Sequence, residues 1–166
     1  MEFDIREATA ADFEAIWPIF HEVISAGETY GYDPDTGKSK AYEFWMKIPL
    51  KTFVLEKNEE VLGTYYIKPN HHGPGAHVCN CGYMVASRAR GQGIATELCR
   101  HSQAVALDLG FLAMQFNFVS SSNVTAVKLW TKLGFVTVGR LPKAFKHPSM
   151  GFFDALVMYK WLEPNS

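Results

Sequence analysis

The pattern of hydrophobic and polar positions predicts a strand, two helices and a long loop in the first third of the chain. Residues 3–6 alternate between apolar and polar types, which is typical of a short strand. Thr9, followed three residues later by Asp12, resembles a capping box at a helix start. The apolar residues that then recur at helical spacing are Phe13, Ile16, Trp17, Phe20, Val23 and Ile24. A glycine-containing loop at 26–40, long enough to suggest a function, and a short helix at 41–48 follow.

The rest of the chain alternates between strand-like and helix-like segments. The expected strands cover residues 52–57, 61–68, 77–86, 113–119, 135–138 and 152–161, with a Pro- and Lys-bearing excursion between the last two. The expected helices, at 94–109 and 124–133, end at Gly110 and Gly134. The order β-α-α-β-β-β-α-β-α-β-β predicts a single domain over residues 1–166, of the α/β or α+β class, with a mixed sheet.

The stretch at 85–95, Val-Ala-Ser-Arg-Ala-Arg-Gly-Gln-Gly-Ile-Ala, joins a predicted strand to a predicted helix. Gly91 and Gly93 stand at the helix entrance, and Arg88 and Arg90 precede them. A glycine turn lets backbone N–H groups point inward without interference from a Cβ. At a helix N-terminus these groups are unpaired and favour an anion. The stretch therefore indicates a diphosphate-binding loop; the alternative is a strand-to-helix turn that merely uses glycine.

Two signatures in the chain resemble those of the GNAT acyltransferase superfamily. Residues 90–95, R-G-Q-G-I-A, fit the pattern R/Q-x-x-G-x-G/A. One strand and one helix later comes the second signature, Asn123-x-x-Ala126-x-x-Leu129-Trp130-x-Lys132-x-Gly134-Phe135. The resemblance implies the GNAT fold, in which a central mixed, mostly antiparallel sheet is flanked by helices. In that fold the strands at 77–85 and 113–119 splay apart and admit the acyl carrier.

The resemblance also implies that acetyl-CoA is the cosubstrate, with its pyrophosphate on the loop at 90–95. Backbone N–H groups near Met84 and Val85 would bind the thioester oxygen once the strand edge is free. Asn123, which also suits a helix N-cap, would contact the pantetheine arm. Trp130 stands where many members have a Tyr acid, so we expect it to pack against the helix or the coenzyme. The implied coenzyme-binding residues are Met84, Val85, Arg90, Gly91, Gln92, Gly93, Ile94, Ala95, Asn123, Ala126 and Trp130.

Asn80 and Asn117 are the candidate catalytic residues. In the phosphinothricin-acetyltransferase-like branch, a carboxylate taken as the base stands at the position of Asn80, whereas an amide cannot accept a proton at neutral pH. Asn80, Asn117 and Asn123 resemble instead the arrangement of the yeast enzyme that acetylates proline analogues. An Asn side chain can orient an amine or bind a carboxylate, or it can simply be satisfied by neighbouring backbone. Glu28 and Tyr30, in the long loop, are candidates with Asn80 for substrate contact; a solvated carboxylate is the alternative for Glu28.

Composition argues against several classes of protein. The net charge of −1, from 16 basic and 17 acidic residues, gives no electrostatic support for nucleic-acid binding. No apolar run has the length of a membrane span, and we expect no signal peptide. Cys79 and Cys81 lie too close on one strand face for an ordinary bridge, so free thiols and a cytoplasmic location are expected. His71, His72 and His77 with these cysteines lack paired ligand spacing, and no metal is expected.

The function that these observations predict is transfer of the acetyl group of acetyl-CoA to the amine of a small molecule, such as an amino acid or an analogue. Two alternatives stay open. One is a protein or peptide N-acetyltransferase, against which the neutral surface argues mildly. The other is a non-catalytic acyl-CoA-binding module, favoured by the missing Tyr and the missing strand carboxylate. The expected partner is a small-molecule amine, with no nucleic acid and no membrane, and a homodimer is one expected assembly.

Overall fold

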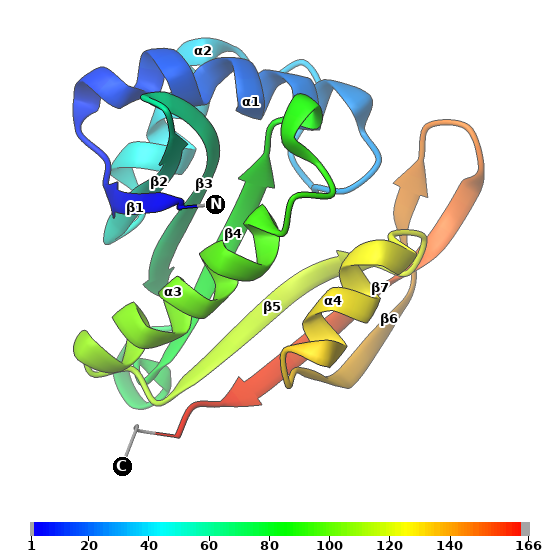
Figure 1. Cartoon of the computed structure of the whole chain (residues 1–166). Helices are drawn as coiled ribbons and strands as arrows, with labels where there is room; N and C mark the ends of the chain where they lie inside the picture. Colours follow the sequence, from blue (N-terminus) through cyan, green and yellow to red (C-terminus); the bar gives the residue numbers. More distant parts are fainter. Residues whose placement is uncertain (1, 164–166) are drawn as a thin grey trace.

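The computed structural model describes residues 2–163, which form a seven-stranded sheet flanked by helices (Figure 1). The strand order is β1-β2-β3-β4-β5-β7-β6, and all neighbours are antiparallel except β4 and β5. The strands are β1 (Asp4–Glu7), β2 (Lys51–Lys57), β3 (Glu60–Pro69), β4 (Val78–Val85), β5 (Ala113–Ser120), β6 (Val136–His147) and β7 (Gly151–Trp161). The predicted fold class, a mixed and mostly antiparallel sheet flanked by helices, is confirmed.

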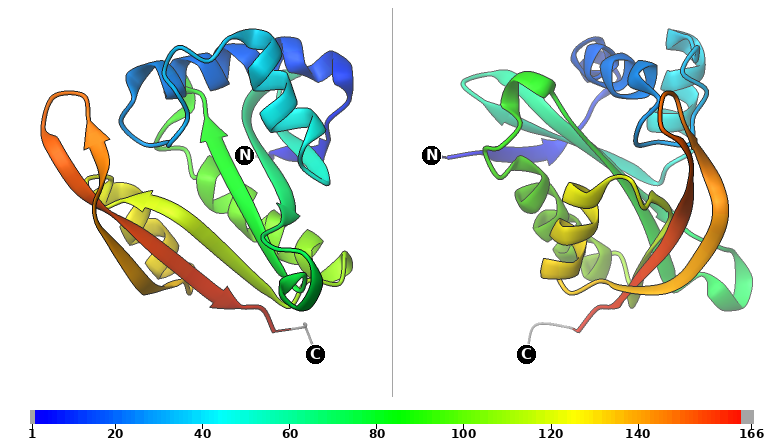
Figure 2. Two further views of the ribbon diagram at one scale, coloured as in Figure 1. Left: turned by 180° about the vertical axis from the view of Figure 1, so that it is seen from behind. Right: turned by 90° about the vertical axis from the view of Figure 1, so that its right-hand side faces the viewer.

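The helices cover both faces of this sheet (Figures 1 and 2). On one face lie α1 (Phe13–Ala26) and α2 (Lys38–Tyr42), the latter followed by a π-helical segment at Glu43–Lys47. On the other face lie α3 (Ile94–Asp108) and α4 (Val124–Lys132).

β3 shows how one strand packs against both layers. On the face of α1 and α2, the Thr64 hydroxyl accepts a hydrogen bond of 3.0 Å from Trp45 Nε1. On the opposite face, the Tyr65 hydroxyl lies 2.8 Å from Nδ1 of His101 in α3. Because helices cover both faces, every residue from 61 to 67 is buried. This accounts for an apolar run in the sequence that is nearly continuous and does not alternate.

β4 and β5 are parallel and pair at only two positions, Val78 with Ala113 and Cys79 with Met114. Beyond these positions the two strands diverge, as Figure 1 and the left view of Figure 2 show. The splay predicted for the strands at 77–85 and 113–119 is therefore present. It opens the middle of the sheet at the C-terminal end of β4, next to the glycine turn.

The C-terminal hairpin differs from the prediction. The sequence predicts a strand only at 135–138, followed by an excursion, but β6 continues through that region. Pro142 and Lys143 lie in a register shift between Leu141 and Phe145, and Lys143 has a φ of 52°. A bulge adds residues to a strand without ending its pairing, and an edge strand tolerates a proline because its outer N–H is not needed.

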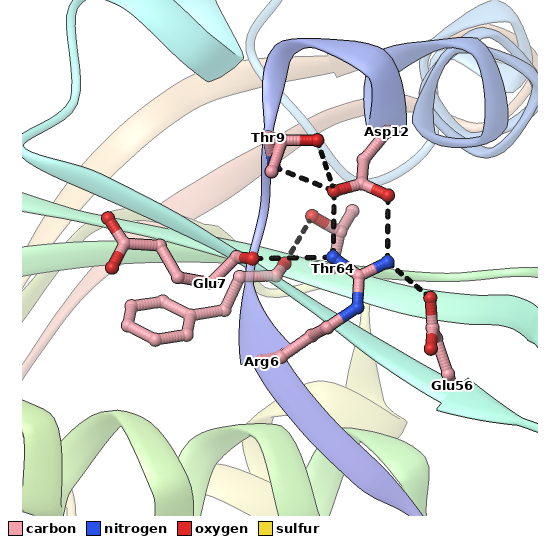
Figure 3. A network of polar contacts seen from close by, with 7 residues as sticks. Arg6, Glu7, Thr9, Asp12, Glu56 and Thr64 are labelled. Atoms are coloured by element: carbon pink, nitrogen blue, oxygen red, sulfur yellow. Dashed lines mark hydrogen bonds and ion pairs between the residues drawn. The ribbon is translucent and has the colours of Figure 1, made fainter.

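A charged network ties β1 to the start of α1 and to β2 (Figure 3). Arg6 donates from Nη1 and Nη2 to the two carboxylate oxygens of Asp12, at 2.8 Å each, and also pairs with Glu56. The Asp12 carboxylate accepts the Thr9 N–H at 2.7 Å, so the predicted capping pair is confirmed. The hydrogen bonds from Arg6 hold the pKa of Asp12 far below its usual range.

Replacing Asp12 with Asn should lower the free energy of unfolding by about 1 kcal/mol at neutral pH, a value discounted for solvent screening. A carboxylate with a lowered pKa in the folded state stabilises the fold above its unfolded pKa. That stabilisation is lost as the pH falls through the folded value. Stability of the parent protein should thus fall more steeply below about pH 4 than that of Asp12→Asn. Urea denaturation at neutral pH and at about pH 3 measures both effects.

Glu14→Gln is the matched control for this substitution. Glu14 also accepts an ion pair, from Lys38 at 2.8 Å, but its side chain is 77% exposed. Exposed pairs contribute little, so this variant should retain the stability and the pH slope of the parent. Equal pH slopes for Asp12→Asn and the parent would show that the Arg6 pair does not stabilise the fold.

Candidate active site

A cleft of about 850 Å³ occupies the gap between β4 and β5. Its walls come from the loop between α1 and α2, from β3, β4 and β5, and from the starts of α3 and α4. Most residues predicted to act line this cleft: Glu28, Tyr30, Asn80, Met84, Val85, Arg90, Ala95, Asn117, Asn123, Ala126 and Trp130. Of the remaining ones, Gly91, Gln92 and Gly93 belong to the turn that joins β4 to α3, and Ile94 is the first residue of α3.

The turn before α3 has the geometry expected of an anion-binding loop. Gly91 and Gly93 have φ values of 79° and 80°, which only glycine adopts readily, and a Cβ on either would meet nothing within 4 Å. The first amides of α3 have no partners within the helix. Arg90 is exposed and its guanidinium group makes no hydrogen bond or ion pair with the described residues, whereas Arg88 is paired with Glu60 at 2.7 Å. Arg90 is thus the arginine of the two that is free to meet a phosphate.

Tyr83 shows which edge of β4 faces the gap. Its N–H and C=O bond to the hydroxyl of Tyr30 and not to β3. Successive residues of a strand direct their backbone groups to opposite sides, so the Val85 N–H also faces the gap. The Met84 N–H faces β3, where Met84 is in register with Thr64. Of the two amides expected to bind the thioester oxygen, only that of Val85 lies on the open edge. Met84 contributes its side chain to the cleft wall.

Tyr30 reaches across the gap from the loop between α1 and α2. Its hydroxyl accepts the Tyr83 N–H at 2.7 Å and donates to the Tyr83 C=O at 2.5 Å. Burial raises the pKa of Tyr30 well above its usual range, so this phenol stays neutral. The predicted strand edge is therefore partly occupied by the protein itself. Glu28, from the same loop, is exposed and makes no hydrogen bond with the described residues, although it lines the cleft.

Asn80 is buried where β4 and β5 begin to separate. Its Oδ1 accepts a hydrogen bond of 2.9 Å from the Tyr66 hydroxyl, and its Nδ2 donates to the Gln115 carbonyl at 3.0 Å. The side chain thus links β3, β4 and β5. One N–H of the Asn80 amide remains for a ligand.

Asn117 lies farther along β5, on the exposed rim of the cleft. Its Oδ1 accepts from Gln115 Nε2 at 2.9 Å, and its Nδ2 donates to Asn70 Oδ1 at 2.7 Å. Gln115 therefore bonds both Asn80 and Asn117, which brings the two predicted residues into one amide network. None of these side chains can act as a base at neutral pH.

Tyr66 is a cleft residue that sequence reasoning missed. It crosses β4 above Gly82, where a Cβ would come within 2.5 Å of Tyr66 Cε1. Only glycine at that position lets the Tyr66 hydroxyl reach Asn80. The signal in the sequence is weak, because it consists of a lone glycine inside a predicted strand.

Asn123 and Trp130 connect the cleft to α4. The Asn123 side chain accepts the Ala126 N–H at 3.3 Å, as a helix N-cap does. The Trp130 ring packs against the rings of Tyr83 and Phe116, with centroid distances of 5.1 Å to each. Trp130 thus packs within the fold at the wall of the cleft. Packing is the expected role, because an indole N–H is not a useful acid.

No group of three or more His, Cys, Asp or Glu side chains among residues 2–163 is placed to hold a metal ion. Cys79, Cys81 and Cys99 are buried free thiols. Within the same range of residues, no helix has the length and apolar character needed to cross a membrane.

Taken together, splayed central strands with a glycine turn at a helix entrance define the fold and site of an acyl-carrier-binding enzyme. Comparison with known proteins places the chain in a family. The model described as Acetyltransferase (GNAT) family matches residues 13–135. The chain belongs to the GNAT family and is an acetyltransferase that uses acetyl-CoA.

Three relatives illustrate the match. N-acetyltransferase aca1 of Schizosaccharomyces pombe is 29% identical over 159 residues, covering 86% of this chain and 76% of the relative. The structure of a GCN5-related N-acetyltransferase from Kribbella flavida is 43% identical, with a TM-score of 0.91 and coverage of 96% and 98%. The acetyltransferase yncA from Salmonella typhimurium, solved with its cofactor acetyl-CoA, shares the fold at 20% identity, with a TM-score of 0.84 and coverage of 100% and 97%.

Substitution of Gly93 should weaken binding of acetyl-CoA. Gly93→Ala strains the backbone at a positive φ, and Gly93→Glu adds a charge that repels the pyrophosphate, so the dissociation constant should rise on the order of tenfold and a hundredfold respectively. Gly73→Ala is the matched control, because Gly73 also has a positive φ, 65°, and open space around a Cβ, but lies outside the cleft. Isothermal titration with acetyl-CoA measures all three. Unchanged affinity in Gly93→Glu would show that the loop does not hold the coenzyme.

Proposed function

We propose that the enzyme transfers the acetyl group of acetyl-CoA to the amine of a small molecule, such as an amino acid or an analogue. The observation that supports this most strongly is that the loop between α1 and α2 forms one wall of the cleft. Tyr30 anchors that loop to β4, and the Tyr30 and Tyr32 rings are stacked with centroids 5.8 Å apart. A wall of this kind suits a small acceptor better than an extended peptide segment.

The coenzyme supplies the acetyl thioester, and the chain positions it. We assign the pyrophosphate to residues 90–95, the pantetheine arm to Asn123 and Ala126, and the thioester oxygen to the Val85 N–H. The amine nitrogen attacks the thioester carbonyl carbon, the carbon–sulfur bond breaks, and coenzyme A leaves as the thiolate, which takes up one proton from water to give the free thiol. The role of the chain is placement of the two reactants and stabilisation of the developing oxyanion.

The acceptor amine has to lose one proton for the reaction to balance. We assign its orientation to Asn80 and Asn117, with Glu28 and Tyr30 as further contacts at the acceptor end. Because neither Asn accepts a proton, a water molecule held by this amide network carries the proton to solvent. The rival route is direct transfer to Glu28, which lines the same cleft.

Cellular context and assembly are part of the same proposal. Three buried free thiols support a reducing compartment such as the cytoplasm, and the balanced charge supports a partner other than nucleic acid. We treat residues 1–166 as one domain. Exposed apolar residues on the β6–β7 hairpin, with Val136 at 59% and Phe152 at 62%, support a homodimer, which sedimentation velocity would detect.

A panel of free amino acids, other small amines and peptides tests this function. Thiol release and product mass should show acetylation of small amines, with peptides used at least about tenfold less well in kcat/KM. Acetylation of peptides in preference to every small amine would favour a protein N-acetyltransferase. Tight binding of acetyl-CoA with no product from any acceptor would favour a non-catalytic module.

Asn80→Ala should lower kcat/KM on the order of 100-fold, because the amine is misplaced and Tyr66 loses its partner. The pH profile of kcat/KM in the parent should follow the pKa of the acceptor amine, and Asn80→Asp should alter that profile by adding a titrating group. Asn70→Ala, which removes the partner of Asn117 without changing a residue that lines the cleft, should cost less than Asn80→Ala. An intact rate in Asn80→Ala, with a collapse in Glu28→Gln, would assign proton removal to the loop.

A further inference from the structure

Lys68 is a cation at the acceptor end of the cleft whose ammonium group has no hydrogen-bond or ion-pair partner among the described residues. It lies near the end of β3, in register with Asn80 of β4, and residues paired in this way project to the same face of the sheet. Lys68 is half-buried and lines the cleft. Its Nζ lies 5.4 Å from the centroid of the Tyr66 ring, whose hydroxyl binds Asn80.

The surroundings of the Lys68 ammonium differ from those of Lys38, Lys51 and Lys160. Lys38 and Lys51 pair with carboxylates at the surface, and Lys160 donates to Gln103 Oε1 and to a backbone carbonyl. The ammonium group of Lys68 makes no hydrogen bond or ion pair with residues 2–163, and it lies over the face of the Tyr66 ring. An ammonium that is partly removed from water without a counterion is unfavourable, and a ligand anion would offset that cost.

Few charged side chains line the cleft. Among the described lining residues, Glu28, Lys68 and Arg90 are the charged ones. Arg90 stands at the phosphate turn, which leaves Lys68 and Glu28 for the acceptor. One cation and one anion beside neutral amide donors match a molecule that carries both a carboxylate and an ammonium group.

We propose that Lys68, with the free N–H of Asn80, binds the carboxylate of the acceptor, so that the acceptor is an amino carboxylic acid and a bare amine is a poor substrate. This inference rests on the proposed acetylation of a small amine and adds the group by which the acceptor is recognised. Lys68 is a specificity residue in this scheme. Its contact is made equally in the ground state and the transition state, so its loss should raise KM and leave kcat nearly unchanged.

The test uses acceptors in matched sets: a free amino acid, its amide and its methyl ester, chosen from those that the parent enzyme acetylates. The parent should use the free acid at least about tenfold better in kcat/KM than the amide or the ester. Lys68→Met keeps the length of the side chain and removes its charge. It should lower kcat/KM for the free acid on the order of 10- to 100-fold through KM, and change kcat/KM for the amide less than about threefold. Lys68→Arg should restore part of the loss.

Lys146→Met is the matched control, because Lys146 also lies over an aromatic ring, with Nζ 5.9 Å from the Phe152 centroid, but outside the cleft. It should behave as the parent does with every acceptor. Unchanged affinity of Lys68→Met for acetyl-CoA would show that the variant is folded. Equal use of acid and amide by the parent, or equal loss for both in Lys68→Met, would overturn the assignment while acetylation of small amines stands. Absence of product from all small acceptors would overturn the proposed function itself.

Discussion

The constraint on which the rest of the structure depends is the early end of pairing between β4 and β5. After Val78 and Cys79, the backbone groups on one edge of β4 have no neighbouring strand. Buried backbone groups need partners, so the fold must satisfy this edge by other means. The Asn80 side chain bridges to the Gln115 carbonyl where the strands part, and the Tyr30 hydroxyl satisfies both groups of Tyr83 farther along. The backbone groups along the gap are thereby satisfied by side chains from two parts of the chain, β4 and the loop between α1 and α2.

Different kinds of side chain fill the two sides of the gap between β4 and β5. On the side of α4, the rings of Tyr83, Phe116, Trp130 and Phe135 pack together, and the Phe116 and Phe135 centroids are 4.4 Å apart. On the side of α1 and α2, Tyr66 crosses β4 above Gly82 and its hydroxyl bonds Asn80. A rigid aromatic wall on one side and a polar, charged lining on the other give the cleft one surface for an apolar arm and one for a polar acceptor.

Features carried by short segments could be predicted from the sequence. The order of the elements follows from periodicity, the turn before α3 from Gly91 and Gly93, and the N-cap of α4 from Asn123. Features that join distant segments could not. Tyr30 and Tyr83 are 53 residues apart, and Asn80 and Gln115 are 35 apart, so no local pattern reports either contact. The choice between the Met84 and Val85 amides depends on which edge of β4 pairs with β3, which also needs the structure.

The titratable side chains around the cleft limit which groups can act as a base or a nucleophile. Burial raises the pKa values of Tyr30, Tyr32 and Tyr66, so these phenols remain protonated and serve as neutral donors and acceptors. Burial also raises the pKa of the Cys81 thiol, which makes it a poor nucleophile near neutral pH. Asn80 and Asn117 do not titrate. In the proposed reaction, the proton that leaves the acceptor amine therefore goes to water or to Glu28, and the strands act by holding the amine and the thioester in place.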